Sequence, residues 1–572
     1  MRLIDVTTLR LHEFYNERLV PKYAILSHTW SSEEVALQEY EQLLAGGPSA
    51  DATYAKQGHM KIVAACKAAE ELGLRWCWID TCCIDKKSSA ELTEVINSMF
   101  KWYLQATVCL AYLDDLDVMT DAQHRRGEEP LMECCRWFTR GWCLQELIAP
   151  SNLIFYDKEW NAVAYKSDIQ EFLSNITGIT QGVLEDPTRL PTIPVACRLA
   201  WASQRVTTRV EDQAYCLLGL FDINMPLLYG EGKKAFLRLQ KEILQRDGDL
   251  SLFAWQPDVG QPEPYMDMFA PSPAQFASSF DTSTMSEGNL HTRNVCSVTS
   301  RGIQISKPIA VSGASNDPTT SSCYYISLEC YSKSIGPWVL KLQMVGPGVY
   351  VRMKESGGFW VRASLDGWEP LDIGDIFVLP TAAHTVIQSI QSYHRGSICF
   401  NPMELRSTRF MEPRPIEAFD FANRRFLTRD LPNFRGYIKF VPDGAKEDTF
   451  CVLLLSLVHR INQELHREPQ PLLQLLHSDV WTKSVAGRYF ASADQLVDHS
   501  IHLAEKTGIE PNGGEQLTVG RYMCSASLVT VEAQGEHVHH VTIDYSEKPS
   551  PDPTSGANSS RALSNRRDSR RH

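Results

Sequence analysis

A glutamate lies inside an otherwise apolar run in the segment TRGWCLQELIAP, residues 139–150. Its neighbours are mostly tryptophan, cysteine, leucine and isoleucine, so a short helix over this run would bury the carboxylate of Glu146. A buried carboxylate must be paired, neutralised or used in a reaction. Two interpretations stay open at this point: a structural partnership with Arg140 or with a donor at a helix end, and a catalytic group that faces a ligand crevice.

Two other segments place polar side chains directly after apolar runs. KYAILSHTW spans residues 22–30, and RWCWIDTCCIDKK spans residues 75–87. The polar or aromatic side chains at their ends are those of Ser27, His28, Trp30, Asp80 and Asp85. Structural roles are open for all of them, because an aspartate after a strand commonly caps the next turn or helix, and a single histidine is commonly only hydrogen-bonded.

Alternating strands and helices must position these side chains. The apolar runs KYAILSHTW, LRWCWID, TVCLAYLDD and NLIFYD are predicted strands. HMKIVAACKAAEELG is a predicted helix that Gly73 ends, a second helix follows the Ser88–Glu91 capping pattern, and the 139–150 segment is a third, ended by Pro150. This order predicts a parallel sheet with helices on both faces. Ligands on such sheets bind beyond the carboxyl ends of the strands, where the polar side chains would meet.

The amino-acid pattern of the 572-residue chain changes along its length. Residues 1–165 are the predicted α/β domain, and residues 166–255 continue it with helical periodicity. Residues 256–545 are predicted to be β-rich, because short strand-like runs alternate there with Gly, Pro, Ser and Asn. Residues 546–572 lack core residues and are predicted to form a disordered basic tail.

Composition and charge limit the function. A formal net charge of −13 argues against a general nucleic-acid binder. No apolar run approaches the roughly 20 residues that cross a bilayer, and the N-terminus lacks a signal-peptide pattern, so a cytoplasmic protein is predicted. The 16 cysteines are spread without C-x-x-C spacing and are expected to be reduced thiols, so neither a metal nor a bound cofactor is predicted.

Three motifs carry a resemblance to a known family. KYAILSHTW, RWCWIDTCCIDKK and RGWCLQE resemble, in this order, the signatures Y-x-x-L-S-[YH]-x-W, W-I-D-x-x-C-I-D-Q and R-x-W-x-x-Q-E of the heterokaryon-incompatibility (HET) domain of filamentous fungi. Lys86 stands where the usual pattern has Gln. The resemblance covers about residues 20–255, including a segment similar to the extension that follows many HET domains. It implies a role in non-self recognition and programmed cell death.

A second, more distant resemblance concerns the Toll/interleukin-1 receptor (TIR) domain, to which HET domains are regarded as related. Its flavodoxin-like parallel sheet fits the predicted order of elements, so the fold class expected is a TIR/flavodoxin-like α/β domain with a helical extension, followed by a β-rich C-terminal domain. The residues WCLQEL, 142–147, are similar to the W-C-L-x-E-L helix of plant TIR domains, whose glutamate cleaves NAD. The resemblance implies that Glu146 is catalytic and that NAD is a substrate.

One carboxylate is enough for this chemistry. Cleavage of NAD at the nicotinamide–ribose bond expels neutral nicotinamide, so it does not need the acid of ordinary glycoside hydrolysis. Opposite unit charges about 4 Å apart interact by roughly 4 kcal/mol at an effective dielectric near 20, equivalent to about three decades of rate. The residues expected to line this site are Ser27, His28, Trp30, Asp80, Asp85, Arg140 and Trp142.

Two functions therefore remain open. The first is a NAD glycohydrolase that kills the cell once it is triggered. The second is a non-enzymatic scaffold that self-associates through the α/β domain and recruits partners of the death pathway. The β-rich half is expected to bind a protein trigger or partner, which is compatible with either.

Overall fold

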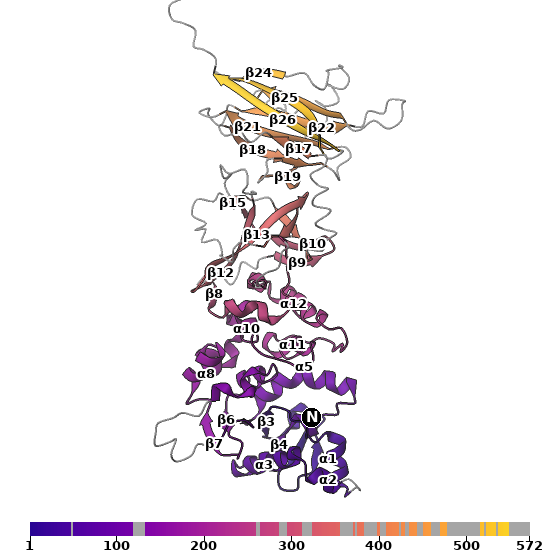
Figure 1. Ribbon diagram of the computed structural model, residues 1–572, viewed down its shortest axis with the longest axis vertical. Helices are drawn as coiled ribbons and strands as arrows, with labels where there is room; N and C mark the ends of the chain where they lie inside the picture. The colour runs from indigo at the N-terminus through magenta and orange to yellow at the C-terminus, as the bar shows by residue number, and fades with distance from the viewer. Residues whose placement is uncertain are drawn as a thin grey trace, which may run out of the picture. The chain divides into compact units, whose positions relative to one another are not determined.

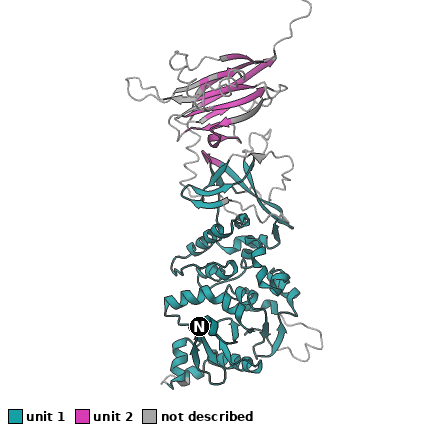
Figure 2. Cartoon of the chain, turned by 180° about the vertical axis from the view of Figure 1, so that it is seen from behind, with its two compact units in different colours: residues 1–311, 323–343, 349–382 teal, residues 312–322, 344–348, 383–572 magenta. Residues whose placement is uncertain are grey.

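The computed structural model describes residues 1–572 except 47–49, 118–131, 259–263, 285–294, 312–322, 355–369, 372–373, 382–396, 401–407, 422–424, 429–433, 443–449, 459–469, 478–514, 520–521, 534–535 and 548–572. The chain forms two compact units (Figure 2). The first comprises Met1–Val311, Cys323–Gln343 and Val349–Ala382, and the second comprises Ser312–Ser322, Met344–Gly348 and Ala383–His572. The boundaries of the four segments predicted from the sequence do not coincide with the boundaries of these two units. The predicted division into residues 1–165, 166–255, 256–545 and 546–572 therefore stays a prediction. The predicted basic tail lies almost entirely outside the described residues.

A seven-stranded sheet organises the N-terminal part of the first unit, in the order β2-β1-β4-β3-β5-β6-β7. Its strands are β1 (Arg2–Asp5), β2 (Leu11–Glu13), β3 (Ala24–His28), β4 (Trp76–Trp78), β5 (Val108–Tyr112), β6 (Leu153–Tyr156) and β7 (Ala162–Tyr165). The four central strands, β4-β3-β5-β6, are parallel, as predicted. The strands at both edges pair antiparallel to their neighbours and were not predicted, so the sheet is mixed.

Helices connect the parallel strands, and Figure 1 shows α3 and α5 on opposite sides of them. The helices are α1 (Leu37–Leu44), α2 (Ala50–Tyr54), α3 (Gln57–Glu71), α4 (Asp80–Cys83), α5 (Ser89–Gln105) and α7 (Cys143–Ile148), with the 3-10 turns η1 (Glu17–Leu19), η2 (Met132–Cys134) and η3 (Arg136–Thr139). Gly73, with φ of 75°, follows α3, and Ser88 caps α5 by accepting from the backbone N–H of Glu91, both as predicted. The Glu91 carboxylate does not complete the capping box, because it pairs with Arg2 instead.

The helical extension follows the sheet. It contains α8 (Gln170–Thr177), α9 (Gln181–Glu185), α10 (Val195–Ala200), α11 (Asp212–Tyr215) and α12 (Lys234–Asp247), with the 3-10 turns η4 (Pro187–Thr192), η5 (Leu218–Phe221), η6 (Leu250–Phe253) and η7 (Pro273–Ser279). Two contacts fix the extension to the α/β layers. Val206 exchanges backbone hydrogen bonds with Thr139 and Gly141, at 2.6 and 2.9 Å. Gly219 of η5 packs against Phe100 of α5 so closely that a Cβ on the glycine would lie 2.2 Å from the Cβ of Phe100.

The Gly219 contact gives an expected stability effect. Gly219→Ala should lower the free energy of unfolding by about 2 kcal/mol, because an added methyl in a packed core forces neighbouring backbone apart. Gly182→Ala in α9 is the matched control, since its Cβ would meet only the flexible end of the Arg189 side chain, at 3.1 Å. Gly182→Ala should leave the free energy of unfolding unchanged or raise it slightly, because alanine has a higher helix propensity than glycine. Urea unfolding midpoints measure both; equal midpoints for the two variants would contradict the close approach at Gly219.

The rest of the first unit contributes a nine-stranded sheet: β8 (Thr282–Thr284), β9 (Val295–Thr299), β10 (Gly302–Ser306), β11 (Ile309–Val311), β12 (Tyr324–Ser332), β13 (Gly336–Gly346), β14 (Val349–Arg352), β15 (Pro370–Leu371) and β16 (Asp375–Val378). Arg352 at the end of β14 is buried and donates hydrogen bonds to the carbonyl oxygens of Phe253 and Trp255, each at 3.1 Å. This strand region is therefore bonded to the end of the helical extension.

The second unit contains a six-stranded and a four-stranded sheet. Its strands are β17 (Ser397–Phe400), β18 (Thr408–Arg414), β19 (Phe419–Asp420), β20 (Arg425–Leu427), β21 (Arg435–Pro442), β22 (Cys451–Val458), β23 (Gln470–His477), β24 (Glu515–Val519), β25 (Tyr522–Ala533) and β26 (Glu536–Glu547), with the turn η9 (Ile416–Ala418). Both sheets contribute to one hydrophobic core, for example Phe426 from the first and Leu453 from the second. The strand-rich C-terminal half is therefore confirmed. Among the helices of the described ranges, none is long and apolar enough to cross a membrane.

Candidate functional site

A pocket of about 320 Å³ opens where β3 and β4 end, in the first unit. It is walled by the segments that follow these strands, by α5, by the start of α7 and by residues 208–229 of the extension. The lining residues are His28, Trp30, Asp80, Ile84, Lys86, Leu92, Ile96, Met99, Tyr103, Arg140, Trp142, Cys143, Glu146, Thr208, Arg209, Asp212 and Tyr229. The carboxyl ends of parallel strands are where open α/β sheets bind ligands.

Glu146 contributes to the floor of this pocket and is held by neutral donors. Its side chain is buried, and the residue is only 7% exposed. The Ser27 hydroxyl, near the end of β3, donates to Oε2 of Glu146 at 2.5 Å, and Trp137 Nε1 donates to the same hydroxyl at 2.7 Å. Burial raises the pKa of Glu146 to about 7, although the bonds from Ser27 and Cys143 act in the opposite direction. Near neutral pH this carboxyl is therefore divided between its acid and its carboxylate form.

Arg140 also lines the pocket but does not neutralise Glu146. The two side chains form no ion pair, and the guanidinium of Arg140 makes no hydrogen bond or ion pair with any described residue. Glu146 is thus buried without a cation in direct contact, although the nearby charge of Arg140 acts to lower its pKa. The geometry favours a carboxyl that is kept for a ligand.

Asp80 anchors the wall formed by the ends of β3 and β4. It accepts hydrogen bonds from His28 Nε2 and from Trp30 Nε1, both at 2.9 Å. Burial acts to raise the pKa of Asp80, but these bonds and the nearby Lys86 ammonium hold it at about 2. Asp80 is therefore a fixed anion that orients the half-exposed Trp30 ring, and Lys86 Nζ lies 3.4 Å from the centre of that ring.

Contact with a buried lysine determines which ring nitrogen of His28 carries the proton. Lys61 Nζ, from α3, lies 2.9 Å from His28 Nδ1 and 2.6 Å from the Glu34 carboxylate. Because an ammonium group can only donate, Nδ1 of His28 accepts and the ring proton sits on Nε2, facing Asp80. Burial acts to raise the pKa of Glu34, but its interactions with His28, with Lys61 and with the Ser31 backbone keep it below its usual range. Both ring nitrogens of His28 are therefore engaged within the wall, Nδ1 by Lys61 and Nε2 by Asp80.

The part of the wall that comes from the extension has a similar construction. Asp212 of α11 accepts from the Tyr229 hydroxyl at 2.9 Å and from the Trp142 indole, so one buried carboxylate orients two aromatic rings. Burial raises the pKa of Asp212. The guanidinium carbon of Arg209 lies 4.4 Å from the centre of the Tyr229 ring. Each wall thus carries an aspartate, the aromatic groups that it holds, and a cation over one ring.

The structure brings most of the sequence-derived site residues together. Those that line the pocket are His28, Trp30, Asp80, Arg140, Trp142 and Glu146. Ser27 lies behind Glu146 as its hydrogen-bond donor. Asp85 lies outside the pocket lining, and its carboxylate accepts from Gln38 Nε2 at 2.7 Å and from the backbone of Lys87 at 3.0 Å, the turn-capping role that was the alternative.

Sequence reasoning missed the residues contributed by other parts of the chain. Lys61 comes from α3 and Glu34 from the segment between β3 and α1, whereas Thr208, Arg209, Asp212 and Tyr229 come from the extension. Helical periodicity identified the extension but gave no sign that residues 208–229, in its middle, line the pocket. The polar cluster TTRVED, residues 207–212, just before an apolar helical run, was the signal available.

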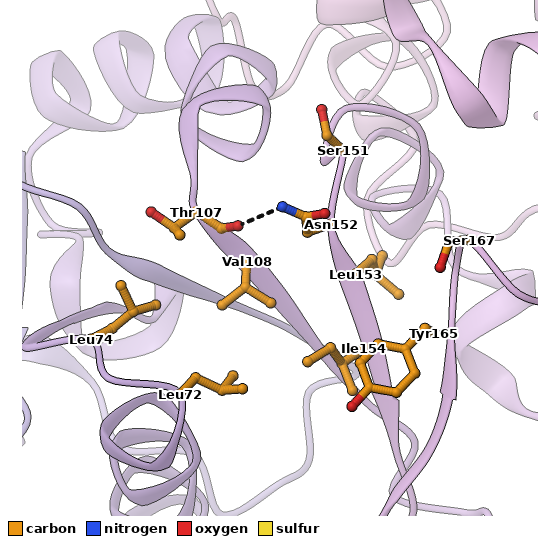
Figure 3. Close-up of a pocket in the computed structure, with 10 residues that line it drawn as sticks. All are labelled: Leu72, Leu74, Thr107, Val108, Ser151, Asn152, Leu153, Ile154, Tyr165 and Ser167. Atoms are coloured by element: carbon orange, nitrogen blue, oxygen red, sulfur yellow. Dashed lines mark hydrogen bonds between the residues drawn. The ribbon is translucent and has the colours of Figure 1, made fainter.

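A second pocket of about 280 Å³ lies at the opposite, amino ends of β5 and β6 (Figure 3). Leucine, isoleucine and valine side chains form much of its wall, and the Asn152 amide donates to the carbonyl of Thr107 at 3.1 Å. Its lining contains no aspartate, glutamate, histidine, lysine or arginine. Among the described residues, no group of three or more His, Cys, Asp or Glu side chains is arranged to hold a metal ion. Of these two pockets, only the Glu146 pocket has the ionisable side chains that acid–base or charge-stabilising chemistry requires.

Fold and pocket define an α/β domain with a pocket at the carboxyl edge of the parallel strands. Residues 23–132 match the family model described as heterokaryon incompatibility protein (HET), so the chain carries a HET domain. Residues 234–291 match a domain of unknown function, DUF8212. The vegetative incompatibility protein HET-E-1 of Podospora anserina is 42% identical over 236 residues. That alignment covers 41% of this chain and 17% of the relative, so the chain spans about a sixth of the length of that protein. No solved structure matches this chain.

Proposed function

We propose that the pocket around Glu146 binds NAD and hydrolyses its nicotinamide–ribose bond, and that the chain acts in heterokaryon incompatibility, in which non-self recognition leads to cell death. The carboxyl of Glu146, buried without a cationic partner on the floor of an open pocket, is the observation that carries the enzymatic part. The family match and the name of the relative support the biological role.

The topology of the sheet supports a TIR-like site. Across the sheet, the four parallel strands lie in the order β4-β3-β5-β6. When these strands are numbered by their position along the chain, this order is 2-1-3-4. Flavodoxin-like sheets have the order 2-1-3-4-5, and their ligands bind where the order reverses, between the first and third strands. Here those strands are β3 and β5, and Ser27, which donates to Glu146, lies in β3. The carboxyl is thus near the position that this fold uses for ligands.

The charges of the pocket suit this reaction. The nicotinamide of NAD is already cationic and leaves as a neutral molecule, so the pocket must stabilise the positive charge that moves onto the ribose. The Glu146 carboxylate can do this, because a fixed charge in a partly water-excluded site needs little reorganisation. Water then bonds to the ribose carbon, one proton is released, and the products are ADP-ribose and nicotinamide.

The bond from Ser27 gives an expected pH effect. Activity in the wild-type chain should rise with pH through about 7 and then level, because Glu146 acts as a carboxylate and its pKa in the free protein is about 7. Ser27→Ala removes a donor to the charged form, so the pKa should rise further and the rising limb should move to higher pH. Initial rates of nicotinamide release at low NAD concentration, from pH 5.5 to 9.5, measure the shift. An unmoved midpoint, with folding intact by circular dichroism, would exclude this role for Ser27.

The full chain with NAD is the direct test of the enzymatic proposal. Free nicotinamide is measured over time at low and high protein concentration, with and without a crowding agent, for the wild-type chain and for Glu146→Gln. Release that depends on Glu146 supports the glycohydrolase. If the wild-type chain releases no nicotinamide under any of these conditions, while Glu146→Gln still kills cells that express it, the enzyme is ruled out and the scaffold function replaces it.

A further inference from the structure

The charges of the Glu146 pocket are separated by depth. Glu146 and Asp212 are buried, at 7% and 9% exposure, whereas Lys86 and Arg209 are exposed and Arg140 is half-buried. The pocket therefore has an acidic interior and a basic mouth. A ligand that fits this polarity has a cationic or electron-poor end that enters first and an anionic part that stays at the mouth.

Two of the three cations at the mouth are free to bind an anion. Lys86 lies over the Trp30 ring and beside Asp80, which compensates its charge. Arg140 and Arg209 make no side-chain hydrogen bond and no ion pair with any residue that the structure describes. The acids next to Arg209 are already engaged: Glu211 accepts from the backbone of Gly230 and Gly232, and Asp212 accepts from Tyr229 and Trp142.

The two arginines come from different parts of the chain but are joined by main-chain contacts. Arg140 precedes α7, and Arg209 follows the strand-like contact of Val206 with Thr139 and Gly141. Arg205 of the same segment donates to the Arg140 carbonyl at 2.9 Å. The backbone around both guanidinium groups is thus fixed, and arginine is the side chain best suited to planar recognition of phosphate oxygens.

We propose that Arg140 and Arg209 bind the diphosphate of the ligand at the mouth of the pocket, so that the helical extension supplies part of the substrate site. The identity of the ligand as a dinucleotide rests on the proposed function. The pocket volume of about 320 Å³ is near the lower end for ligand sites, so it encloses the nicotinamide riboside end while the diphosphate lies at the mouth.

Binding of ADP-ribose to the full chain tests this inference without catalysis. Isothermal titration calorimetry is carried out with the wild-type chain, Arg209→Gln, Arg140→Gln and the double variant. Each single variant should bind ADP-ribose roughly tenfold or more weakly, because one charged hydrogen-bonding group is lost. Arg189→Gln, an exposed arginine of η4 outside the pocket lining, is the matched control and should bind as the wild-type chain does. Added salt should weaken ADP-ribose binding to the wild-type chain more than ADP-ribose binding to the double variant.

The outcomes separate this inference from the proposed function. If Arg209→Gln and Arg189→Gln bind ADP-ribose equally well, or if the wild-type chain does not bind it, the diphosphate site is excluded even when NAD is cleaved. If ADP-ribose binding depends on both arginines but NAD is not cleaved, the anion site stands and the glycohydrolase fails. Nicotinamide riboside, which lacks phosphate, should bind the wild-type chain and the double variant alike; a loss as large as that for ADP-ribose would show a general collapse of the pocket and overturn the assignment.

Discussion

Replacing Glu146 with glutamine is expected to lower nicotinamide release by two to three orders of magnitude and, at the same time, to stabilise the folded chain at pH 8. The first effect follows from the loss of the charge that faces the ribose, for which roughly 4 kcal/mol, or about three decades of rate, is the upper estimate. Glutamine keeps the size of the side chain and an oxygen that can accept from Ser27, so the pocket should keep its shape.

The stability gain follows from the pKa of Glu146. The folded chain raises it from 4.5 to about 7, so the folded state holds this proton more tightly than the unfolded state does. Stability contributed by the group is therefore present below pH 4.5 and is lost as the pH rises through 7. The difference corresponds to about 3 kcal/mol at pH 8. Glutamine carries no such proton, so Glu146→Gln should remove most of this cost at pH 8 and have little effect at pH 5.

Urea unfolding at pH 5 and pH 8 measures this second effect. Glu41→Gln, an exposed glutamate of α1, is the matched control and should show no comparable difference between the two pH values. A purely structural glutamate would behave in the opposite way, because its replacement would lower stability at both. Reduced stability of Glu146→Gln at pH 5 and at pH 8 would therefore argue that the carboxyl supports the fold and not a reaction.

Lys61→Met is expected to cause the largest loss of stability among single substitutions near the pocket, about 3 kcal/mol or more. Lys61 is 8% exposed and donates to both the Glu34 carboxylate and His28 Nδ1. Methionine fills a similar volume but leaves a largely buried carboxylate and a ring nitrogen without their donor. Removing one partner of a buried ion pair typically costs about 3–5 kcal/mol, because the other charge stays buried and uncompensated.

Two comparisons make this expectation specific. Lys67→Met, on the same helix, removes an exposed lysine whose pair with Glu71 is solvated, so its cost should be below about 1 kcal/mol. The double variant Lys61→Met with Glu34→Gln should recover part of the lost stability, because the uncompensated charge is then absent. Urea midpoints at pH 7 test both. If Lys61→Met is as stable as Lys67→Met, the buried network does not hold the wall of the pocket.

The central fold could be predicted because its signals are local. Strands that are covered on both faces appear as continuous apolar runs, and Gly73, Ser88 and Pro150 mark helix boundaries by backbone chemistry. The edge strands were missed for the opposite reason. β7 is largely exposed and β2 has only three residues, so neither has an apolar run or a clear alternation.

The site could be predicted only in part, because the rule for parallel sheets locates residues that follow strands. It led to His28, Trp30 and Asp80, whereas Asp85 lies only five residues further along yet is turned into a local capping contact. Lys61 could not be found in this way. A lysine in a helix normally lies on the solvated face, and only the folded chain shows that this one is buried against Glu34.

The bond between Arg352 and the end of the extension bears on how such a protein can exchange parts during evolution. A recombination joint placed directly after Trp255 would leave the main-chain oxygens of Phe253 and Trp255 without the guanidinium that caps them. The first unit also includes two later segments of the chain, Cys323–Gln343 and Val349–Ala382. The segments up to the end of β16 therefore belong to the same compact unit as the HET domain, and a chain cut before Arg352 would lose this contact at the end of the extension.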